Sequence, residues 1–131
     1  MKTASFRRLL AVMTLAGIAC LASPAYAKPS ANWRISFNHQ SDNDGTIVFR
    51  IAPVEGTPID IEVKVPAKTT ENSVADLVSS AIKATVGSEN YRVGVDDGED
   101  VVVKTRGKTK KFELSMVSTS LTGLEIKVKH N

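Results

Sequence analysis

Cysteine and histidine are nearly absent from this chain of 131 residues. The one cysteine, Cys20, lies in an apolar N-terminal stretch, and the two histidines are His39 and His130. The rest of the chain therefore offers no disulfide framework and no thiol nucleophile. A zinc site or a catalytic histidine needs partners on rigid elements, whereas His39 falls in an expected turn and His130 beside the C-terminus. We expect both to be ordinary surface residues, and we expect no metal site and no cofactor.

Long hydrophobic runs are scarce as well, and the N-terminal one has a specific meaning. Leu9 to Leu21 is about 13 residues long, whereas a membrane-spanning helix needs about 20. A basic stretch precedes it and the A-x-A motif of Ala25 to Ala27 follows it, which is typical of a secretory signal peptide. We therefore expect a signal peptide at residues 1–27, a single exported domain at residues 28–131 in the periplasm or outside the cell, and no membrane span. Lipid attachment at Cys20 is a minor alternative, since the three residues before it lack the leucine usual in lipoprotein signals.

Net charge is also missing from the expected exported domain. The 17 basic residues fall to 14 without Lys2, Arg7 and Arg8 of the signal peptide, and the acidic residues also number 14. The formal charge of +3 therefore belongs to the signal peptide alone. A neutral domain has no general attraction for nucleic acid or membrane surfaces, so we expect no nucleic-acid partner.

One stretch, residues 73–86, has the periodicity of an amphipathic helix. Ser73 and Asp76 resemble a capping box at its start, and Gly87 stands where a helix can end in a left-handed residue. Four polar residues are expected to face water: Asp76, Ser79, Ser80 and Lys83. The apolar stripe consists of Val74, Leu77, Val78, Ala81, Ile82 and Val86.

Apolar and polar residues alternate in the stretches on both sides of this helix, which is typical of strands with one buried face. The pattern predicts an α+β fold with mainly antiparallel twisted sheet of about six or seven strands, in the order βββαββββ, and with the helix packed on one face. Residues 33–37 and 47–51 are expected to form a first hairpin. Asp96 to Gly98 is a turn signal between two later strands.

Two acidic stretches resemble metal-binding loops only in part. Asp42 to Gly45 lacks the acidic residue that a calcium loop places at its twelfth position, where this chain has Ile51. Asp96 to Asp100 is dense in carboxylates, but it coincides with the hairpin turn. We interpret both stretches as solvated polar turns.

Basic residues gather in one short stretch after the second acidic turn. Five cations within eight residues would hold an anionic partner, although a solvated loop is the plainer explanation. No aromatic residue lies among them before Phe112, which argues against base stacking on single-stranded nucleic acid. The candidate ligand-binding residues are Lys104, Arg106, Lys108, Lys110 and Lys111.

No catalytic signature is present: the chain has neither a G-x-S-x-G nor an S-x-x-K context, and its glycines form no phosphate-binding loop. We therefore expect a non-catalytic exported binding or structural module of the bacterial envelope, whose basic loop contacts an anionic envelope polymer or another protein. A secreted inhibitor that inserts Ala52 to Pro58 into the active site of a protease or other hydrolase is the first alternative. A small hydrolase with paired carboxylates, Glu55 with Asp60 or Asp97 with Glu99, is the second.

The order of elements from Gly56 to Val103 carries a resemblance. A Thr-Pro pair precedes an alternating strand, a threonine-rich cap, a short helix rich in valine and alanine, and two strands around a turn. This arrangement resembles the small α+β repeats inserted in phage tail-sheath and flagellar hook-associated proteins. It covers under half of the chain and includes no invariant motif. The resemblance implies a scaffold or assembly role in place of catalysis.

Overall fold

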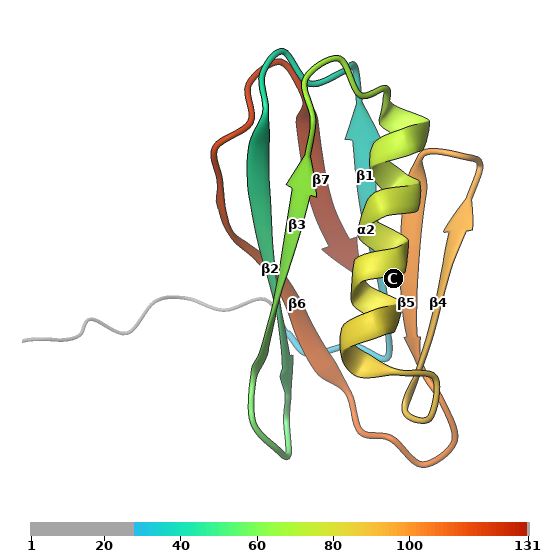
Figure 1. The fold of residues 1–131 in the computed structure, drawn as a ribbon. Helices are drawn as coiled ribbons and strands as arrows, with labels where there is room; N and C mark the ends of the chain where they lie inside the picture. The colour runs from blue at the N-terminus through green and yellow to red at the C-terminus, as the bar shows by residue number, and fades with distance from the viewer. Residues whose placement is uncertain (1–27, 131) are drawn as a thin grey trace, which may run out of the picture.

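The structure is a computed structural model that describes residues 28–130, so the signal peptide expected at residues 1–27 lies outside the described part. The expected α+β fold and the order βββαββββ are both confirmed (Figure 1). The elements are β1 (Asn32–Asn38), β2 (Gly45–Pro53), β3 (Ile59–Val65), α2 (Glu71–Val86), β4 (Tyr91–Asp96), β5 (Asp100–Thr105), β6 (Phe112–Thr119) and β7 (Glu125–His130).

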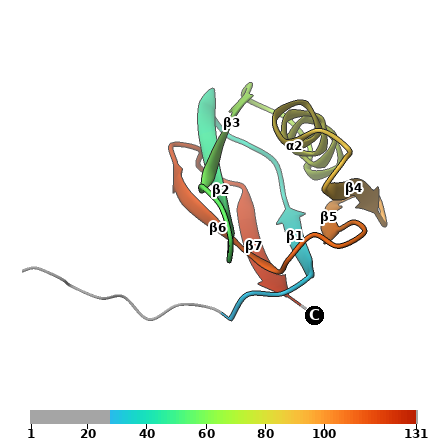
Figure 2. The same cartoon turned by 90° about the horizontal axis from the view of Figure 1, so that it is seen from below.

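The strands form two antiparallel sheets that face each other. One sheet has the order β4-β5-β1-β7 and the other the order β3-β2-β6, and Figure 2 shows the two layers from below. The predicted hairpin of residues 33–37 and 47–51 is wrong, because β1 pairs with β5 and β7 while β2 pairs with β3 and β6. Residues 39–44 carry the chain from one sheet to the other. Period-two alternation identifies a strand with a buried face, but it contains no information on which strand is the neighbour.

Helix α2 packs against both sheets at the side where β3 and β4 form their outer edges (Figures 1 and 2). The connection from β3 through α2 to β4 therefore links two sheets and is not a crossover within one sheet. Each sheet leaves an apolar edge on this side, and the helix covers both at once.

The helix begins two residues earlier than the sequence pattern indicates. Its N-cap is Thr70, whose side chain accepts a hydrogen bond from the Ser73 backbone N–H, so Ser73 lies inside the first turn. Gly87 ends the helix with a φ of 73°, as expected, and its N–H donates to the Lys83 carbonyl. A backbone bridge between Thr70 and Gln40 joins this cap to the loop before β2.

The buried face of α2 is rotated from the expected one. Leu77 was placed in the stripe but is 38% exposed, whereas Ser79 was assigned to water and is buried. The helix lies in the angle between two sheets, so a second row at spacing four, Ala75 and Ser79, also turns inward. Both residues are small and let the helix approach closely. The buried set is Val74, Ala75, Val78, Ser79 and Ile82.

The core fills the space between the sheets and is closed at one end by aromatic side chains. Trp33 is buried, and its indole N–H donates to the Phe112 carbonyl oxygen at 2.7 Å. The ring of Tyr91 meets the ring of Phe112 edge-on at 5.1 Å. Burial raises the pKa of Tyr91 because it disfavours the phenolate. These contacts tie β1, β4 and β6 together directly above the loops that carry the candidate cations.

Candidate functional site

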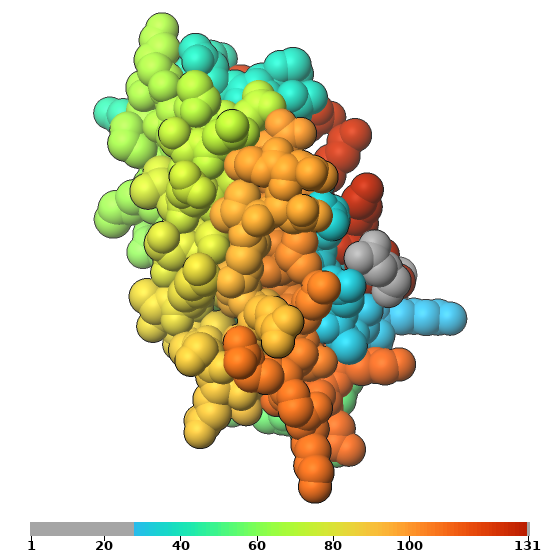
Figure 3. Space-filling model, turned by 90° about the vertical axis from the view of Figure 1, so that its right-hand side faces the viewer, coloured from blue at the N-terminus to red at the C-terminus, as the bar shows by residue number. Residues whose placement is uncertain are grey.

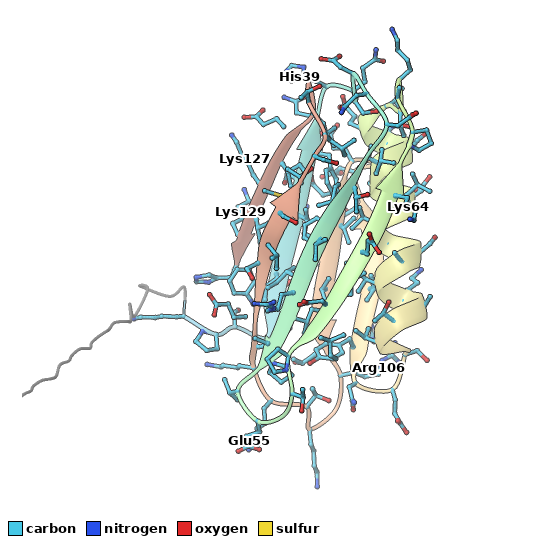
Figure 4. All side chains as sticks on the ribbon, turned by 60° about the vertical axis from the view of Figure 1, so that its left-hand side comes forward. His39, Glu55, Lys64, Arg106, Lys127 and Lys129 are labelled. Atoms are coloured by element: carbon cyan, nitrogen blue, oxygen red, sulfur yellow. The ribbon has the colours of Figure 1, made fainter. Side chains whose placement is uncertain are left out.

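The strands run along one axis, so their connections gather at two opposite ends of the domain. We define the basic end by the loops 54–58, 87–90 and 106–111, and the acidic end by the loops 39–44, 66–70, 97–99 and 120–124. Figure 4 shows Glu55 and Arg106 at the basic end and His39 at the acidic end. The names follow the formal charges of the loops.

The structure places all five predicted cations at or beside the basic end, and all are exposed. Lys104 lies near the end of β5, and the other four follow in the loop 106–111. Within residues 28–130, the ion pairs are made by Arg34, Arg50 and Lys127, so none of the five is paired with a carboxylate. Exposed cations without an ion-pair partner leave their field directed at solvent, where an anionic partner would meet it.

The five cations do not form one cluster. Lys104 points from the outer face of the four-stranded sheet, where its Cα partners are Asn32 and Arg92. Lys108 and Lys110 line a hollow of about 330 Å³ that includes Glu55 of the neighbouring loop. The five cations therefore lie on two surfaces: Lys104 is on the outer face of the four-stranded sheet, and Lys108 and Lys110 are between the loops.

Two further cations at this end were missed by sequence reasoning. Lys83 in the last turn of α2 and Arg92 on β4 line a hollow of about 340 Å³ together with Arg106. The alternation around Arg92 predicts that it points outward, but its neighbours depend on strand order. Because strand order is a long-range property, only the folded chain brings these cations next to Arg106.

The acidic end is bound together by short polar side chains. The Asn43 amide NH₂ donates to the Ser120 carbonyl, and its Oδ1 accepts from the Thr122 N–H. Asp44 Oδ1 accepts from the Ala67 N–H at 2.7 Å. The stretch from Asp42 to Gly45 is thus a polar turn as interpreted, and its side chains join three loops.

Ser41 is the buried centre of these contacts. Its hydroxyl donates to the Pro66 carbonyl at 2.7 Å and accepts from the Thr69 N–H at 2.9 Å. Its backbone N–H donates to Thr69 O, and its backbone carbonyl accepts from Lys68 N–H. The side chain and the two backbone groups of Ser41 therefore hold the loop before β2 against the loop before α2.

Two carboxyl groups meet at the acidic end, but they are not a pair that the sequence suggested. Glu99 hydrogen bonds to Glu71 in the first turn of α2, and this bond, with partial desolvation and the nearby negative charge, raises the pKa of Glu99. His39 donates its backbone N–H to the same Glu71 carboxylate. Asp97 is exposed in the turn, with a φ of 54°.

In the other suggested pair, Glu55 with Asp60, the Asp60 carboxylate forms an ion pair with Arg50. Arg50 donates to both carboxylate oxygens of Asp60, at 2.7 and 3.1 Å, on the outer face of the three-stranded sheet. The hydrogen bonds and charge of Arg50 lower the pKa of Asp60. Glu55 is exposed in the loop 54–58. Asp60 is thus engaged with Arg50, which is not the arrangement of a free general acid or base.

The described residues also bear on metal binding and on membrane insertion. Between residues 28 and 130, no group of three or more histidine, cysteine, aspartate or glutamate side chains is arranged to hold a metal ion. In the same part of the chain, no helix has both the length and the apolar character that crossing a membrane requires.

Comparisons with known proteins give few matches. No protein family matches the chain, and no curated protein matches it. Among solved structures, the crystal structure of the D1-D2-D3 domains of the flagellar cap protein FliD from Escherichia coli is similar over 80% of this chain, with 17% sequence identity and a TM-score of 0.34. The chain covers 40% of the length of that structure. The resemblance inferred from Gly56 to Val103 stays a prediction.

Proposed function

We propose that residues 28–131 form a non-catalytic binding module, exported to the bacterial envelope, that contacts an anionic polymer through the basic end. One observation supports this function best. The exposed cations of the loop 106–111 lie at the same end of the domain as Lys83, Arg92 and Lys104, on neighbouring surfaces, and none of them has an ion-pair partner within residues 28–130. Cations that stabilise a fold are usually paired with carboxylates, so these unpaired cations are available to an external anion.

The overall neutrality of the expected exported chain gives this surface a defined role. Seven of its 14 basic residues lie at or beside the basic end, and the loops of the other end carry a net negative charge, so attraction for an anion is local and oriented. Such attraction decays within about 8 Å at physiological salt, so it acts only on a partner that comes close to the basic end.

The test removes the loop cations and measures retention on dextran sulfate. Replacing Lys108, Lys110 and Lys111 with Ser is expected to lower the salt concentration needed for elution by at least half, with an unchanged Tm, because all three side chains are exposed and unpaired. The matched control removes the same formal charge elsewhere through Lys64→Ser, Lys127→Ser and Lys129→Ser, at positions that lie on the strands and away from the basic end (Figure 4).

The control variant is expected to elute close to the wild type. Equal losses in the two variants would show that retention depends on total charge and would contradict a contact at the basic end. Unchanged retention of the loop variant would also contradict it.

A secreted inhibitor of a hydrolase is the second candidate function, and one observation favours it. In the expected loop Ala52 to Pro58, Val54 is 53% exposed although it is apolar, and Gly56 has a φ of 128° that an L side chain rarely adopts. A protruding apolar residue on a restrained loop is the kind of group that fills an enzyme subsite. A 1:1 complex with an envelope or secreted hydrolase that Val54→Asp abolishes would support the inhibitor, and its absence would favour the polymer.

A further inference from the structure

A hollow of about 400 Å³ lies on the outer face of the four-stranded sheet, beside the basic end. Its lining comes from β4, β5 and β1, three neighbouring strands. Figure 3 shows the outer surface of β4 and β5 in orange, with the beginning of β1 beside them in blue. The volume falls in the lower part of the range of small-ligand sites, about 300–1,000 Å³.

The floor of this hollow is open because a glycine occupies β4. Gly94 is the Cα partner of Val102 on β5, and a Cβ atom added to Gly94 would have no heavy atom within 4 Å. Gly94 is not among the glycines with positive φ, so the backbone does not require it there. Glycine weakens a strand, and a glycine that no turn or bulge explains marks a place where another molecule approaches the backbone.

One side of the hollow consists of three side chains in a row across the sheet. Lys104 is the Cα partner of both Arg92 and Asn32, and neither cation has an ion-pair partner within residues 28–130. The Oδ1 atom of Asn32 is buried and has no hydrogen-bond partner in the structure. An atom with so little accessible surface is out of reach of a ligand in the hollow, so Arg92 and Lys104 are the groups on this side that can bind one.

The opposite side is held rigid by an ion pair. Arg34 donates to Asp96 Oδ2 at 2.9 Å and to Asp100 Oδ2 at 2.6 Å, and these bonds raise the pKa of Arg34. Asp96 keeps 53% of its side chain exposed, so its carboxylate retains room to accept from a ligand hydroxyl. The hollow thus offers cations on one side and an accessible carboxylate acceptor on the other.

We propose that this hollow binds one carboxylated sugar residue of an acidic polysaccharide. The carboxylate lies against Arg92 and Lys104, the ring covers Gly94, and a hydroxyl group donates to Asp96. A bare sulfate has no hydroxyl group to donate to Asp96, and neither sulfate nor phosphate has a ring to cover Gly94. The inference rests on the proposed function in one respect, because it names the class of polymer that the basic end attracts.

The experiment is an NMR titration of amide shifts in the full-length exported protein, with tetragalacturonate and a hyaluronan tetrasaccharide as probes. At least one probe is expected to shift the amides of Gly94 and Val102, whereas the neutral maltotetraose shifts neither. Equal shifts with maltotetraose would overturn the assignment of a carboxylate ligand, and no shift with either acidic probe would overturn the proposal.

The most specific variant places a side chain on the floor of the hollow. Gly94→Leu changes no charge and meets open space, so the fold is expected to keep its Tm while the affinity falls at least about tenfold. The double variant Arg92→Gln and Lys104→Gln is expected to lose at least as much affinity, because it cannot form the charge-assisted hydrogen bonds to the carboxylate. Unchanged affinity of Gly94→Leu would overturn the proposal.

A matched charge control separates this inference from the proposed function. Lys108→Gln with Lys110→Gln removes the same charge from the loop and is expected to leave the probe affinity within about twofold, since these residues do not line the hollow. Retention on dextran sulfate without shifts at Gly94 would refute the sugar site and leave the function of the basic end intact. If the protein is not retained on dextran sulfate but the acidic probes still shift the Gly94 amide, the sugar site is supported and the contact through the loop 106–111 is refuted.

Discussion

The two ends of the domain differ in how their polar residues are used. At the acidic end, short side chains such as Ser41, Asn43 and Asp44 bind backbone groups of other loops. At the basic end, the backbone makes the connections: Arg106 N–H donates to the Asn90 carbonyl, and another bond joins Val54 N–H to Lys111 O. The long cationic side chains are left out of these connections.

The difference follows from the reach of the side chains. A hydroxyl, amide or carboxylate on one or two carbons stays near the backbone and can satisfy its orphan groups, which makes the acidic end a structural joint. A lysine or arginine head stands several bonds away, keeps its hydration, and loses rotamer entropy if it is fixed. The side chains of the acidic end therefore join its loops, whereas the cationic side chains of the basic end remain available for contact.

The largest expected contrast concerns one hydroxyl at each end. Ser41→Ala removes two hydrogen bonds of a fully buried hydroxyl, leaves the Thr69 N–H without its partner and leaves the Pro66 carbonyl with the Thr69 hydroxyl alone, so it is expected to lower the free energy of unfolding by about 2 kcal/mol. At the basic end, Thr109→Ala removes an exposed bond of 3.3 Å to Asn90 and is expected to cost less than about 0.5 kcal/mol. Urea unfolding of both variants measures the difference. Equal costs would contradict a structural role confined to the acidic end.

A smaller contrast is expected between the two ends of α2. Thr70→Ala removes the N-cap at the acidic end and is expected to lower the free energy of unfolding by about 1 kcal/mol. Thr85→Ala, in the last turn, removes only a bond from the Thr85 hydroxyl to the Ala81 carbonyl within the helix, and alanine has the higher helix propensity. We therefore expect Thr85→Ala to be neutral or slightly stabilising. Thermal unfolding followed by circular dichroism tests both, and a costly Thr85→Ala would refute the contrast.

The smallest contrast is electrostatic and depends on pH. The folded state raises the pKa of Glu99 through Glu71, so it binds this proton more tightly than the unfolded state. Stability from this group is therefore present at low pH and is lost as pH rises through the raised pKa. Glu99→Gln is expected to raise Tm at pH 7 by on the order of 1 °C, and the gain is expected to disappear near pH 4, about the ordinary pKa of glutamate.

The comparison at the basic end uses Glu89, which lies in the exposed loop 87–90 among the cations. Glu89→Gln removes an attraction there and is expected to leave Tm unchanged or slightly lower at pH 7. A gain from Glu89→Gln as large as that from Glu99→Gln would show that the two ends do not differ in their electrostatic balance.

Sequence periodicity predicted the elements better than their contacts. The strands and the helix were recognised because each has one buried face, and the turn at Asp97 and Gly98 because both adopt positive φ. The predicted partner of β1 was wrong, and the predicted inner face of α2 was wrong at two positions, since Leu77 is exposed and Ser79 is buried. Both errors concern neighbours distant in the sequence, about which local patterns are silent.

The candidate surface shows the same division. The run from Lys104 to Lys111 is visible in the sequence because its cations are adjacent along the chain. Arg92 and Asn32 were not recognised, because they join Lys104 only through strand pairing. No role for Gly94 was predicted, because the hollow that it lines is formed only when β4, β5 and β1 pair in the sheet.

Local composition and periodicity specify the strands, the helix, the loop charges and the turn chemistry of this protein, because each depends on residues within a few positions of one another. Tertiary structure alone decides that the strands divide into two sheets, that α2 joins them, and that opposite charges gather at opposite ends. The physical reason is that burial rewards any apolar face equally, whereas hydrogen bonding between strands and packing of the whole core select one arrangement of those faces.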